Sequence, residues 1–508
     1  MESKILVFPH DENNKTLINN VHPQEWKNPE PAPRYNMVVI GAGTAGLVTA
    51  AGAAGLGAKV ALIERQFMGG DCLNVGCVPS KGIIRAGRAV HDVKTSGDFG
   101  ISSAVNVSIN FDKAMERMRR IRADISAHDS VQRFSKELRI DVFLGEGKFL
   151  GLDTIQVGGS KLQFKKAALC CGARAFVPPI PGLEETGYLT NETVFWLTEL
   201  PRTLAVIGGG PIGCELAQTF ARMGSQVTIL QKGGQILPRE DIDAAECVQR
   251  SFAQDGIKLR LHAKILKTAQ NGNKKIIAIE EHSKHVELSV DQILIAVGRA
   301  PNVEGLDLEK AQITYDLRSG VKVNDHLQTT NHRVYAAGDI CSPYKFTHTA
   351  DAMARIVIAN ALFMATQKVS SLVIPWCTYT DPEVAHVGMY EKDARDKGID
   401  VLTLTVPLST VDRALLDGEA EGFARVHLKK GCDKILGATI VARHAGEMIN
   451  ELSLAITAGL GFSAIGKTIH PYPTQAEIIK RLADAYNKTR LTPFVKKLFN
   501  TWCRWQRS

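Results

Sequence analysis

The fold of this chain is decided by Tyr35-Asn-Met-Val-Val-Ile-Gly41-Ala-Gly43-Thr-Ala-Gly46. The apolar run predicts a buried strand, and the glycine spacing predicts a tight turn into a helix of small residues. A second strand follows and ends at Glu64, 23 residues after Gly41. Three such glycines followed by an acid that can bind a ribose hydroxyl are typical of a βαβ unit that binds a dinucleotide.

A second copy of this pattern occurs in the middle of the chain. The strand Thr203–Ile207 runs into Gly208-Gly-Gly210-Pro-Ile-Gly213, a helix, and the strand Gln226–Leu230. Each copy follows a strand and opens a helix, which is the context that makes this glycine spacing specific. The chain is therefore expected to have two dinucleotide sites, for two cofactors or for a cofactor and a co-substrate.

The two copies differ at the position of the acid. Gln231 lies 23 residues after Gly208, where the first copy has Glu64, and Lys232 follows it. An acid at this position repels the 2′-phosphate of NADPH, whereas a neutral amide beside a cation tolerates or attracts it. The sequence therefore predicts that the second site prefers NADPH to NADH.

Two cysteines follow the first unit closely, in Gly70-Asp-Cys72-Leu-Asn-Val-Gly-Cys77-Val-Pro79. Proline suits a first helical turn, so we expect a helix to begin near Pro79. The N–H groups and the dipole of that turn favour a thiolate at Cys77. The pair is therefore predicted to form a dithiol redox centre that can close a small disulfide ring against a bound cofactor.

Composition is that of a large globular protein of about three domains. The net charge is +8, but the cations are spread along the chain and no zinc-finger, homeodomain or RNP pattern occurs, so nucleic acid is not an expected partner. No uncharged apolar run approaches the roughly 18 residues of a membrane span, and Met1–Lys15 lacks the apolar core of a secretory signal. Ten cysteines scattered through mostly apolar segments favour a reducing cytoplasm.

Two further motifs complete an ordered set. Gly298-Arg299 closes the second unit, and Ala337-Gly338-Asp339 ends a later strand. Together with the two glycine patterns and the cysteine block, they resemble the class I pyridine nucleotide-disulfide oxidoreductases, FAD flavoproteins that include glutathione reductase, dihydrolipoamide dehydrogenase and mercuric reductase. The resemblance covers roughly Arg34 to Asn487. It implies an α/β fold with two Rossmann-like domains, for FAD and NAD(P)H, and a C-terminal α+β dimerisation domain.

The resemblance also implies a division of the chain. Its expected parts are a flexible arm (1–34), the first part of an FAD-binding domain with the redox cysteines (35–202), an NAD(P)H-binding domain (203–300), the second part of the FAD-binding domain (301–372), a dimerisation domain (373–488) and an amphipathic basic tail (489–508). The protein would be a homodimer in which each active site is shared between subunits.

Cofactor roles follow from the same resemblance. The residues that would hold FAD are Gly41, Gly43, Gly46, Glu64, Gly70 and Asp339. Those that would hold the nicotinamide nucleotide are Gly208, Gly210, Gly213, Gln231, Lys232, Gly298 and Arg299.

Roles in the redox chemistry are implied as well. Cys77 would lie against the flavin as a thiolate, and Cys72 would face the substrate. Lys81 and Glu215 match an ion pair near the flavin. Asp71 stands where the family usually has threonine, and its charge should raise the pKa of Cys72.

The acid–base segment departs from the disulfide reductases. Those enzymes carry His-Pro-Thr-x-x-Glu, whereas this chain has His470-Pro-Tyr472-Pro-Thr-Gln-Ala-Glu477. Tyr472 therefore takes the position of the base, with Glu477 five residues on, and an unperturbed pKa of about 10 makes it a poor base near neutrality. His470 is the alternative base if the prolines bend the loop differently.

Mercuric reductases also have a tyrosine at this position, and Val411-Asp-Arg-Ala-Leu415 resembles a stretch of theirs. We therefore expect a mercuric reductase-like enzyme that reduces thiol-bound Hg(II) or a related soft metal ion. Cys72 and Cys77 would bind that metal transiently, since thiolates are soft ligands. The alternatives are a disulfide or dithiol oxidoreductase of the glutathione reductase or dihydrolipoamide dehydrogenase type, and a redox-sensing flavoprotein with little turnover.

The end of the chain is amphipathic and basic. Phe494, Leu498, Phe499, Trp502 and Trp505 are expected near one helical face, and cations are available to the others. Packing on the chain's own dimer and a weak contact with an anionic membrane surface both fit this pattern.

Overall fold

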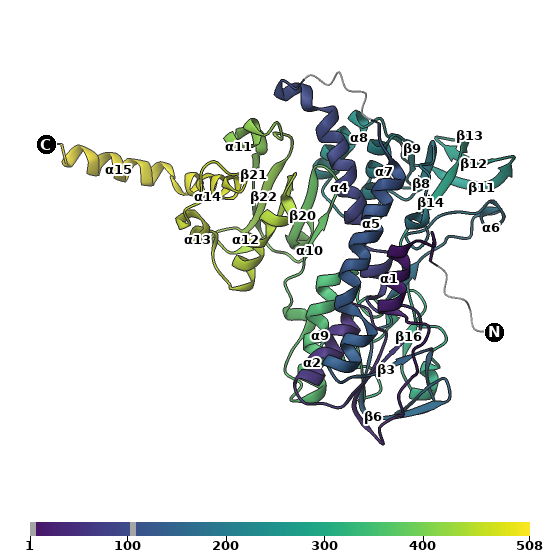
Figure 1. Cartoon of the computed structure of the whole chain (residues 1–508). Helices are drawn as coiled ribbons and strands as arrows, with labels where there is room; N and C mark the ends of the chain where they lie inside the picture. Colours follow the sequence, from purple (N-terminus) through teal and green to yellow (C-terminus); the bar gives the residue numbers. More distant parts are fainter. Residues whose placement is uncertain (1–6, 102–107, 508) are drawn as a thin grey trace. The chain divides into compact units, whose positions relative to one another are not determined.

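The computed structural model describes residues 7–101 and 108–507, which form two compact units. Unit 1 comprises residues up to 236 together with 255–372, and unit 2 comprises 237–254 together with the chain from 373 onward. Both units combine helices and sheets, as the expected α/β fold requires (Figure 1).

The first sheet of unit 1 has the strand order β3-β2-β1-β6-β5-β4, with β18 beside β6. Its strands are β1 (Tyr35–Ile40), β2 (Val60–Glu64), β3 (Asp141–Leu144), β4 (Gly147–Phe149), β5 (Thr154–Val157), β6 (Ser160–Leu169) and β18 (Val334–Ala336). β4 and β5 form an antiparallel edge, and the other strands run parallel. β18 comes from 301–372 and the rest from 35–202, so both segments expected to bind FAD build one sheet.

Two helices pack side by side on this sheet, α2 (Thr44–Gly55) and α9 (Thr347–Leu362) (Figure 1). The core between the helices and the sheet includes Met37 of β1, Leu62 of β2 and Val357 of α9, and all three are fully buried. Because the parallel strands are covered on their faces, they read as continuous apolar runs rather than as alternating patterns.

The second sheet of unit 1 has the strand order β10-β9-β8-β14 and is parallel throughout. Its strands are β8 (Thr203–Ile207), β9 (Gln226–Leu230), β10 (Lys258–Arg260) and β14 (Gln292–Ile295), and α7 (Pro211–Met223) connects β8 to β9. The expected second βαβ unit is therefore confirmed. An antiparallel sheet adjoins it in the chain, made of β11 (Lys264–Asn271), β12 (Lys274–Glu281) and β13 (Lys284–Val290).

Several further elements of unit 1 are short. They include α6 (Leu183–Thr186) and two strand pairs, β7 (Ala173–Ala175) with β15 (Arg299–Pro301) and β16 (Tyr315–Asp316) with β17 (Gly320–Val321).

The N-terminal segment is folded where the structure describes it. Residues 1–6 lie outside the described range, but Glu12–Val21 form helix α1, which buries Leu17 and Val21. Arg122 on α5 (Phe111–Ser126) donates a 2.7 Å hydrogen bond to the side-chain oxygen of Asn14. The prediction of a flexible arm is therefore wrong for residues 7–34, because two apolar residues four apart suffice to dock a helix whose other residues are mostly polar.

Unit 2 is built on a five-stranded antiparallel sheet with the order β19-β20-β23-β22-β21. Its strands are β19 (Pro375–Thr378), β20 (Glu383–Gly388), β21 (Val401–Pro407), β22 (Phe423–Lys429) and β23 (Ile435–Ala442), and its helices are α8 (Ile242–Gln254), α10 (Glu391–Asp396), α11 (Asp412–Leu416), α12 (Ala445–Thr457), α13 (Phe462–Lys467), α14 (Glu477–Arg490) and α15 (Pro493–Trp505). One face of the sheet packs on α12 and α14 through buried residues such as Ile440, Leu452 and Leu482.

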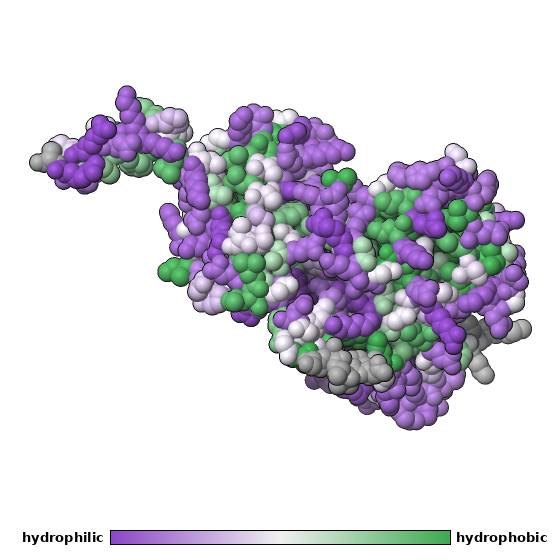
Figure 2. Space-filling view, turned by 90° about the horizontal axis from the view of Figure 1, so that it is seen from above, coloured by the Kyte–Doolittle hydropathy of each residue, from purple (hydrophilic) through white to green (hydrophobic). Residues whose placement is uncertain are grey.

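Helix α15 follows α14 directly and buries none of its residues. Both hydrophobic and hydrophilic residues are visible on its surface (Figure 2). Within residues 7–101 and 108–507, no helix combines the length and the apolar composition needed to cross a bilayer.

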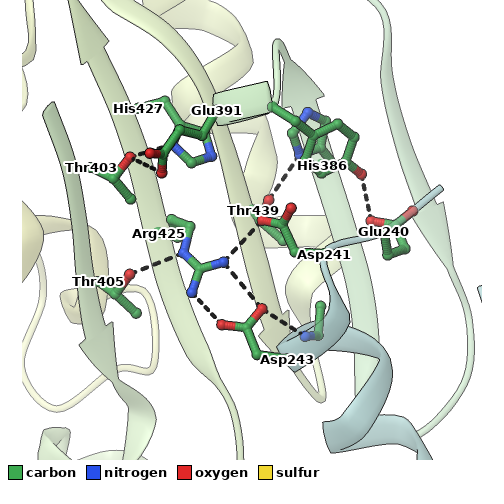
Figure 3. A network of polar contacts seen from close by, with 12 residues as sticks. Glu240, Asp241, Asp243, His386, Glu391, Thr403, Thr405, Arg425, His427 and Thr439 are labelled. Atoms are coloured by element: carbon green, nitrogen blue, oxygen red, sulfur yellow. Dashed lines mark hydrogen bonds and ion pairs between the residues drawn. The ribbon is translucent and has the colours of Figure 1, made fainter. Parts of the chain in front are cut away.

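The other face of the unit 2 sheet is polar (Figure 3). Arg425 lies 2.9 Å from Asp241 and also pairs with Asp243, both in the segment 237–254. This segment was expected to belong to the NAD(P)H-binding domain at 203–300, but these ion pairs attach it to unit 2.

Two histidines are fully buried on this polar face. His386 contacts the hydroxyl of Thr439 at 2.8 Å, and His427 contacts the hydroxyl of Thr403 at 3.0 Å. Burial disfavours the charged imidazolium and lowers the pKa of His386 to about 3, and it lowers the pKa of His427 as well. The charged form is therefore disfavoured for both rings, and the His386 ring is neutral in the folded protein at neutral pH.

The neutral state of His386 predicts a loss of stability in acid. The pKa of His386 in the folded protein lies below the unfolded value of about 6.5. The free energy that the neutral ring contributes to stability is therefore fully present above pH 6.5 and is lost as the pH falls below 6.5. Between pH 7 and pH 5 this loss should be on the order of 2 kcal/mol. His386→Gln, which stays neutral, should flatten the fall of the apparent Tm over this range, and His332→Gln, at an exposed histidine, should not. Equal slopes for the two variants would contradict the assignment.

Candidate functional site: two dinucleotide turns and a dithiol

The first glycine turn excludes any side chain for steric reasons. A Cβ on Gly41, whose φ is +97°, would lie 2.4 Å from the carbonyl oxygen of Cys170. A Cβ on Gly46 would lie 1.7 Å from the carbonyl oxygen of Gly41. The strand end and the helix start can therefore meet only if both residues are glycine.

The second turn repeats this geometry. A Cβ on Gly208 would lie 2.4 Å from the carbonyl oxygen of Ala296. A Cβ on Gly213 would lie 2.1 Å from the carbonyl oxygen of Gly208. Gly210 differs, because its Cβ would meet no atom of the described chain within 4 Å. The fold does not require glycine there, but a pyrophosphate that approaches the backbone at the start of α7 does.

Gly43 in the first copy is similarly open. Its Cβ would contact only Gly70 among the described residues, at 3.7 Å, and a Cβ on Gly70 would lie 2.5 Å from the Cα of Gly43. Both turns thus leave the space that a dinucleotide backbone needs, so the residues present fit FAD at the first turn and a nicotinamide nucleotide at the second.

Glu64 and Gln231 occupy the same structural position in the two copies. Glu64 accepts a 2.7 Å hydrogen bond from the backbone N–H of Ala42, and Gln231 accepts a 3.0 Å bond from that of Gly209. Each side chain closes its own glycine turn, and the second copy does so without a negative charge. Lys232 is exposed beside Gln231.

An open pocket lies at the carboxyl ends of β1 and β2. It is lined by Gly41, Glu64, Gly147 and Cys171, among others. Ligands of parallel α/β sheets bind beyond these strand ends, so the pocket suits part of the dinucleotide expected at the first turn.

The two predicted redox cysteines lie on consecutive helices. Cys72 is in the short α3 (Gly70–Asn74), and Cys77 is the first residue of α4 (Cys77–Lys94), so the helix begins two residues before the expected Pro79. Both cysteines are free thiols, Cys72 half-buried and Cys77 exposed. The Cys77 sulfur lies 3.4 Å from the hydroxyl of Thr347 at the start of α9, a contact that no sequence motif indicated.

The pair is electrostatically asymmetric. The hydrogen bond from Cys72, together with the charge of Lys81, lowers the pKa of Cys77 to about 6. The same hydrogen bond, burial and the negative charge of Asp71 raise the pKa of Cys72. The expected effect of Asp71 is thus confirmed, and the thiolate of the reduced pair resides on Cys77.

Lys81 is itself held by Glu215. Its ammonium lies 2.9 Å from the carboxylate of Glu215, which is buried on α7. Lys81 lies one helical turn after Cys77, so this ion pair connects the dithiol helix with the helix of the second glycine turn. The predicted pairing of Lys81 with Glu215 is present.

Arg299 lies between two acids of unit 1. It is 3.0 Å from Asp71 and 3.5 Å from Asp339, and it donates a 2.6 Å hydrogen bond to the carbonyl of Ala173. Gly298, with φ +137°, precedes it in a conformation that favours glycine. The expected contact of Arg299 with the nicotinamide nucleotide stays a prediction, whereas its contact with the cysteine helix through Asp71 was not foreseen.

The candidate acid–base residues belong to unit 2. Tyr472 is 70% exposed, and its hydroxyl donates a 3.0 Å hydrogen bond to Asp412, which raises the pKa of Tyr472. Glu477 accepts instead from Arg481 at 3.0 Å. Asp412, within the Val411–Leu415 stretch already noted, is thus the carboxylate bonded to the tyrosine.

His470 is bound within unit 2. Its Nε2 lies 3.1 Å from the carboxylate of Glu451, and only 5% of its side chain is exposed. Of the two candidates for the base, Tyr472 is therefore the one whose side chain is accessible.

Comparison with known proteins agrees with this geometry. The model of the pyridine nucleotide-disulphide oxidoreductases matches residues 35–354, and that of their dimerisation domain matches residues 374–483. The structure of the HOCl-induced flavoprotein disulfide reductase RclA from Escherichia coli superposes with a TM-score of 0.80, at 30% identity, over 89% of this chain and 99% of that one.

Curated relatives include enzymes with different acceptors. A mercuric reductase from Staphylococcus aureus is 35% identical over 89% of this chain and 83% of its own length. A dihydrolipoyl dehydrogenase from Bacillus subtilis is 31% identical over 89% of this chain and 98% of its own. The family binds FAD and a pyridine nucleotide, in keeping with the two glycine turns. The chain belongs to the pyridine nucleotide-disulphide oxidoreductase family.

Proposed function

We propose that the protein is a homodimeric, cytoplasmic, NADPH-dependent flavoenzyme that reduces thiol-bound Hg(II) or a related soft metal ion. The observation that carries this proposal is the exposed Tyr472, bonded to Asp412, where disulfide reductases have a histidine. The identity of 34–35% to mercuric reductases of three bacteria supports it.

The residues of unit 1 would hold both cofactors. Gly41, Gly43 and Gly46 suit FAD, and Gly208, Gly210 and Gly213 suit the nicotinamide nucleotide. When bound, FAD would relay two electrons from the nicotinamide to the metal ion held by the cysteine pair.

The cysteine pair would act as a chelate. Cys77, with a pKa of about 6, is largely a thiolate at neutral pH and can displace one thiol from the incoming metal complex. Cys72 then loses its proton as it binds the metal. The overall change is NADPH + H⁺ + Hg(SR)₂ → NADP⁺ + Hg⁰ + 2 RSH, so the two electrons of the hydride end on mercury, and its proton and one proton from solvent end on the two released thiols.

Tyr472 suits this reaction better than disulfide cleavage. A disulfide substrate releases a thiolate that an acid must protonate, and the Asp412 contact makes Tyr472 a still weaker acid. A phenol hydroxyl can instead donate a hydrogen bond to a metal-bound thiolate, in place of the bond that Tyr472 donates here to Asp412.

A disulfide or dithiol acceptor is the second candidate. The similarity of this chain to the dihydrolipoyl dehydrogenase of Bacillus subtilis and to the flavoprotein disulfide reductase of Escherichia coli favours it. The Escherichia coli protein, which is 30% identical to this chain, has also been solved as a Cu(II) complex. In that case His470 would have to serve as the base.

The acceptor is tested by the oxidation of NADPH with Hg(II) plus excess thiol, with glutathione disulfide and with lipoamide. We expect turnover with Hg(II) and little with the disulfides, and Tyr472→Phe should lower the Hg(II) rate by about tenfold. Tyr315→Phe is the matched control, because that hydroxyl also donates to a carboxylate, Glu309. Turnover with a disulfide alone would refute the metal proposal.

Removal of the Lys81 charge should raise the pKa of Cys77. Lys81→Met leaves the Cys77 thiolate with one cation fewer one turn away, so alkylation of the reduced protein should require a higher pH. Arg85→Met removes the same charge one turn farther along α4 and should shift the pH dependence of alkylation less. Coincident pH profiles for the two variants would contradict the role given to Lys81.

Cofactor preference is tested at Gln231. Glu64 shows that a carboxylate can make the equivalent backbone contact, so Gln231→Glu should preserve the turn while repelling the 2′-phosphate. The ratio of kcat/KM for NADPH to that for NADH should fall by about tenfold or more. Gln163→Glu, at an exposed position on β6, carries the same charge change and should leave the ratio unaltered. An unaltered ratio in Gln231→Glu would remove the basis for the NADPH assignment.

A further inference from the structure

Helix α15 exposes a continuous apolar face. It begins at Pro493, after Thr492 accepts a hydrogen bond from the N–H of Val495, and it buries no residue. At 3.6 residues per turn, its apolar residues occupy an arc of about 140°. They are Phe494, Val495, Leu498, Phe499, Trp502 and Trp505. Phe494 is 75% exposed and Trp505 is 66% exposed.

The rest of the helix is basic. Lys496, Lys497 and Arg504 lie on the opposite arc. Residues 485–507 contain six cations and no Asp or Glu. A partner that neutralises this segment must therefore be anionic.

Helix α15 lies beyond the residues that match the family's dimerisation domain. The match to that domain ends at residue 483, ten residues before α15 begins. The buried core of unit 2 likewise ends at Tyr486. The helix therefore lies outside both the matched dimerisation domain and the buried core of unit 2.

The physical features of α15 suit one kind of occupant. Two copies of α15 packed against each other would gather their cations with no acid in the segment to offset them. A lipid surface with anionic headgroups binds the cations, accepts the apolar side chains below the headgroups and favours tryptophan at that depth. With 13 residues the helix is too short to span a bilayer, which takes about 20, so it must lie in the plane of the surface.

We propose that α15 docks the protein on the surface of an anionic lipid bilayer. The apolar face enters the headgroup boundary, and the cations around it bind the lipid phosphates. A single helix of this size gives reversible attachment that weakens with salt, because the charge attraction is screened. The proposal goes beyond the proposed function and does not depend on the electron acceptor.

The test uses the FAD-loaded full chain and sedimentation with vesicles. Binding is expected to vesicles of equal parts phosphatidylglycerol and phosphatidylcholine at about 20 mM salt, and much less at about 500 mM salt or to phosphatidylcholine alone. Trp502→Glu should lower the partition coefficient by at least about tenfold.

Asn500→Glu is the matched control. It adds the same charge to α15, but on the hydrophilic side, so the partition coefficient should fall by less than about threefold. NADPH oxidation by both variants verifies that they fold, since α15 buries no residue.

Three outcomes would overturn the proposal. The first is no binding to the anionic vesicles at low salt, and the second is equal loss of binding in the two variants. The third is a change in molecular mass for Trp502→Glu without a change in vesicle binding, which would assign the apolar face to a contact between copies of the chain.

Discussion

The close approach of a strand and a helix at each glycine turn is the constraint on which unit 1 depends. The carbonyl oxygens of Cys170 and Ala296 occupy the space where a side chain on Gly41 or Gly208 would be. This contact brings the start of α2 or α7 to the carboxyl end of its sheet. Both dinucleotide sites, and the cysteine helix that follows the first of them, take their positions from it.

The dithiol depends on charges held by both βαβ units. Lys81 stabilises the Cys77 thiolate and is bound to Glu215 on α7, so a residue next to the second glycine turn supports a sulfur that follows the first. On the other side, Arg299 binds Asp71 beside Cys72. Because the pKa of Cys72 is raised while that of Cys77 is lowered, the reduced pair has one defined nucleophile rather than two equivalent thiols.

Local patterns predicted the elements whose residues carry a local signal. β1, β8 and β9 have the expected bounds, since continuous apolar runs between turn residues indicate buried parallel strands. The helix of the N-terminal segment was missed because its docking requires only Leu17 and Val21 within a polar stretch. The ion pairs of Arg425 with Asp241 and Asp243 join the segment 237–254 to unit 2 over more than 180 positions of the chain, and no local pattern indicates them.

The sequence by itself determined the two glycine turns, the redox cysteines and the pairing expected between Lys81 and Glu215. Steric exclusion and thiol chemistry act over a few residues, and an ordered set of such motifs is specific to a family. Only the tertiary structure decided that Asp412 is the partner of Tyr472, that His470 is held by Glu451 and that Arg299 lies beside Asp71. These contacts join segments distant in the chain, and their geometry exists only after the sheets have formed.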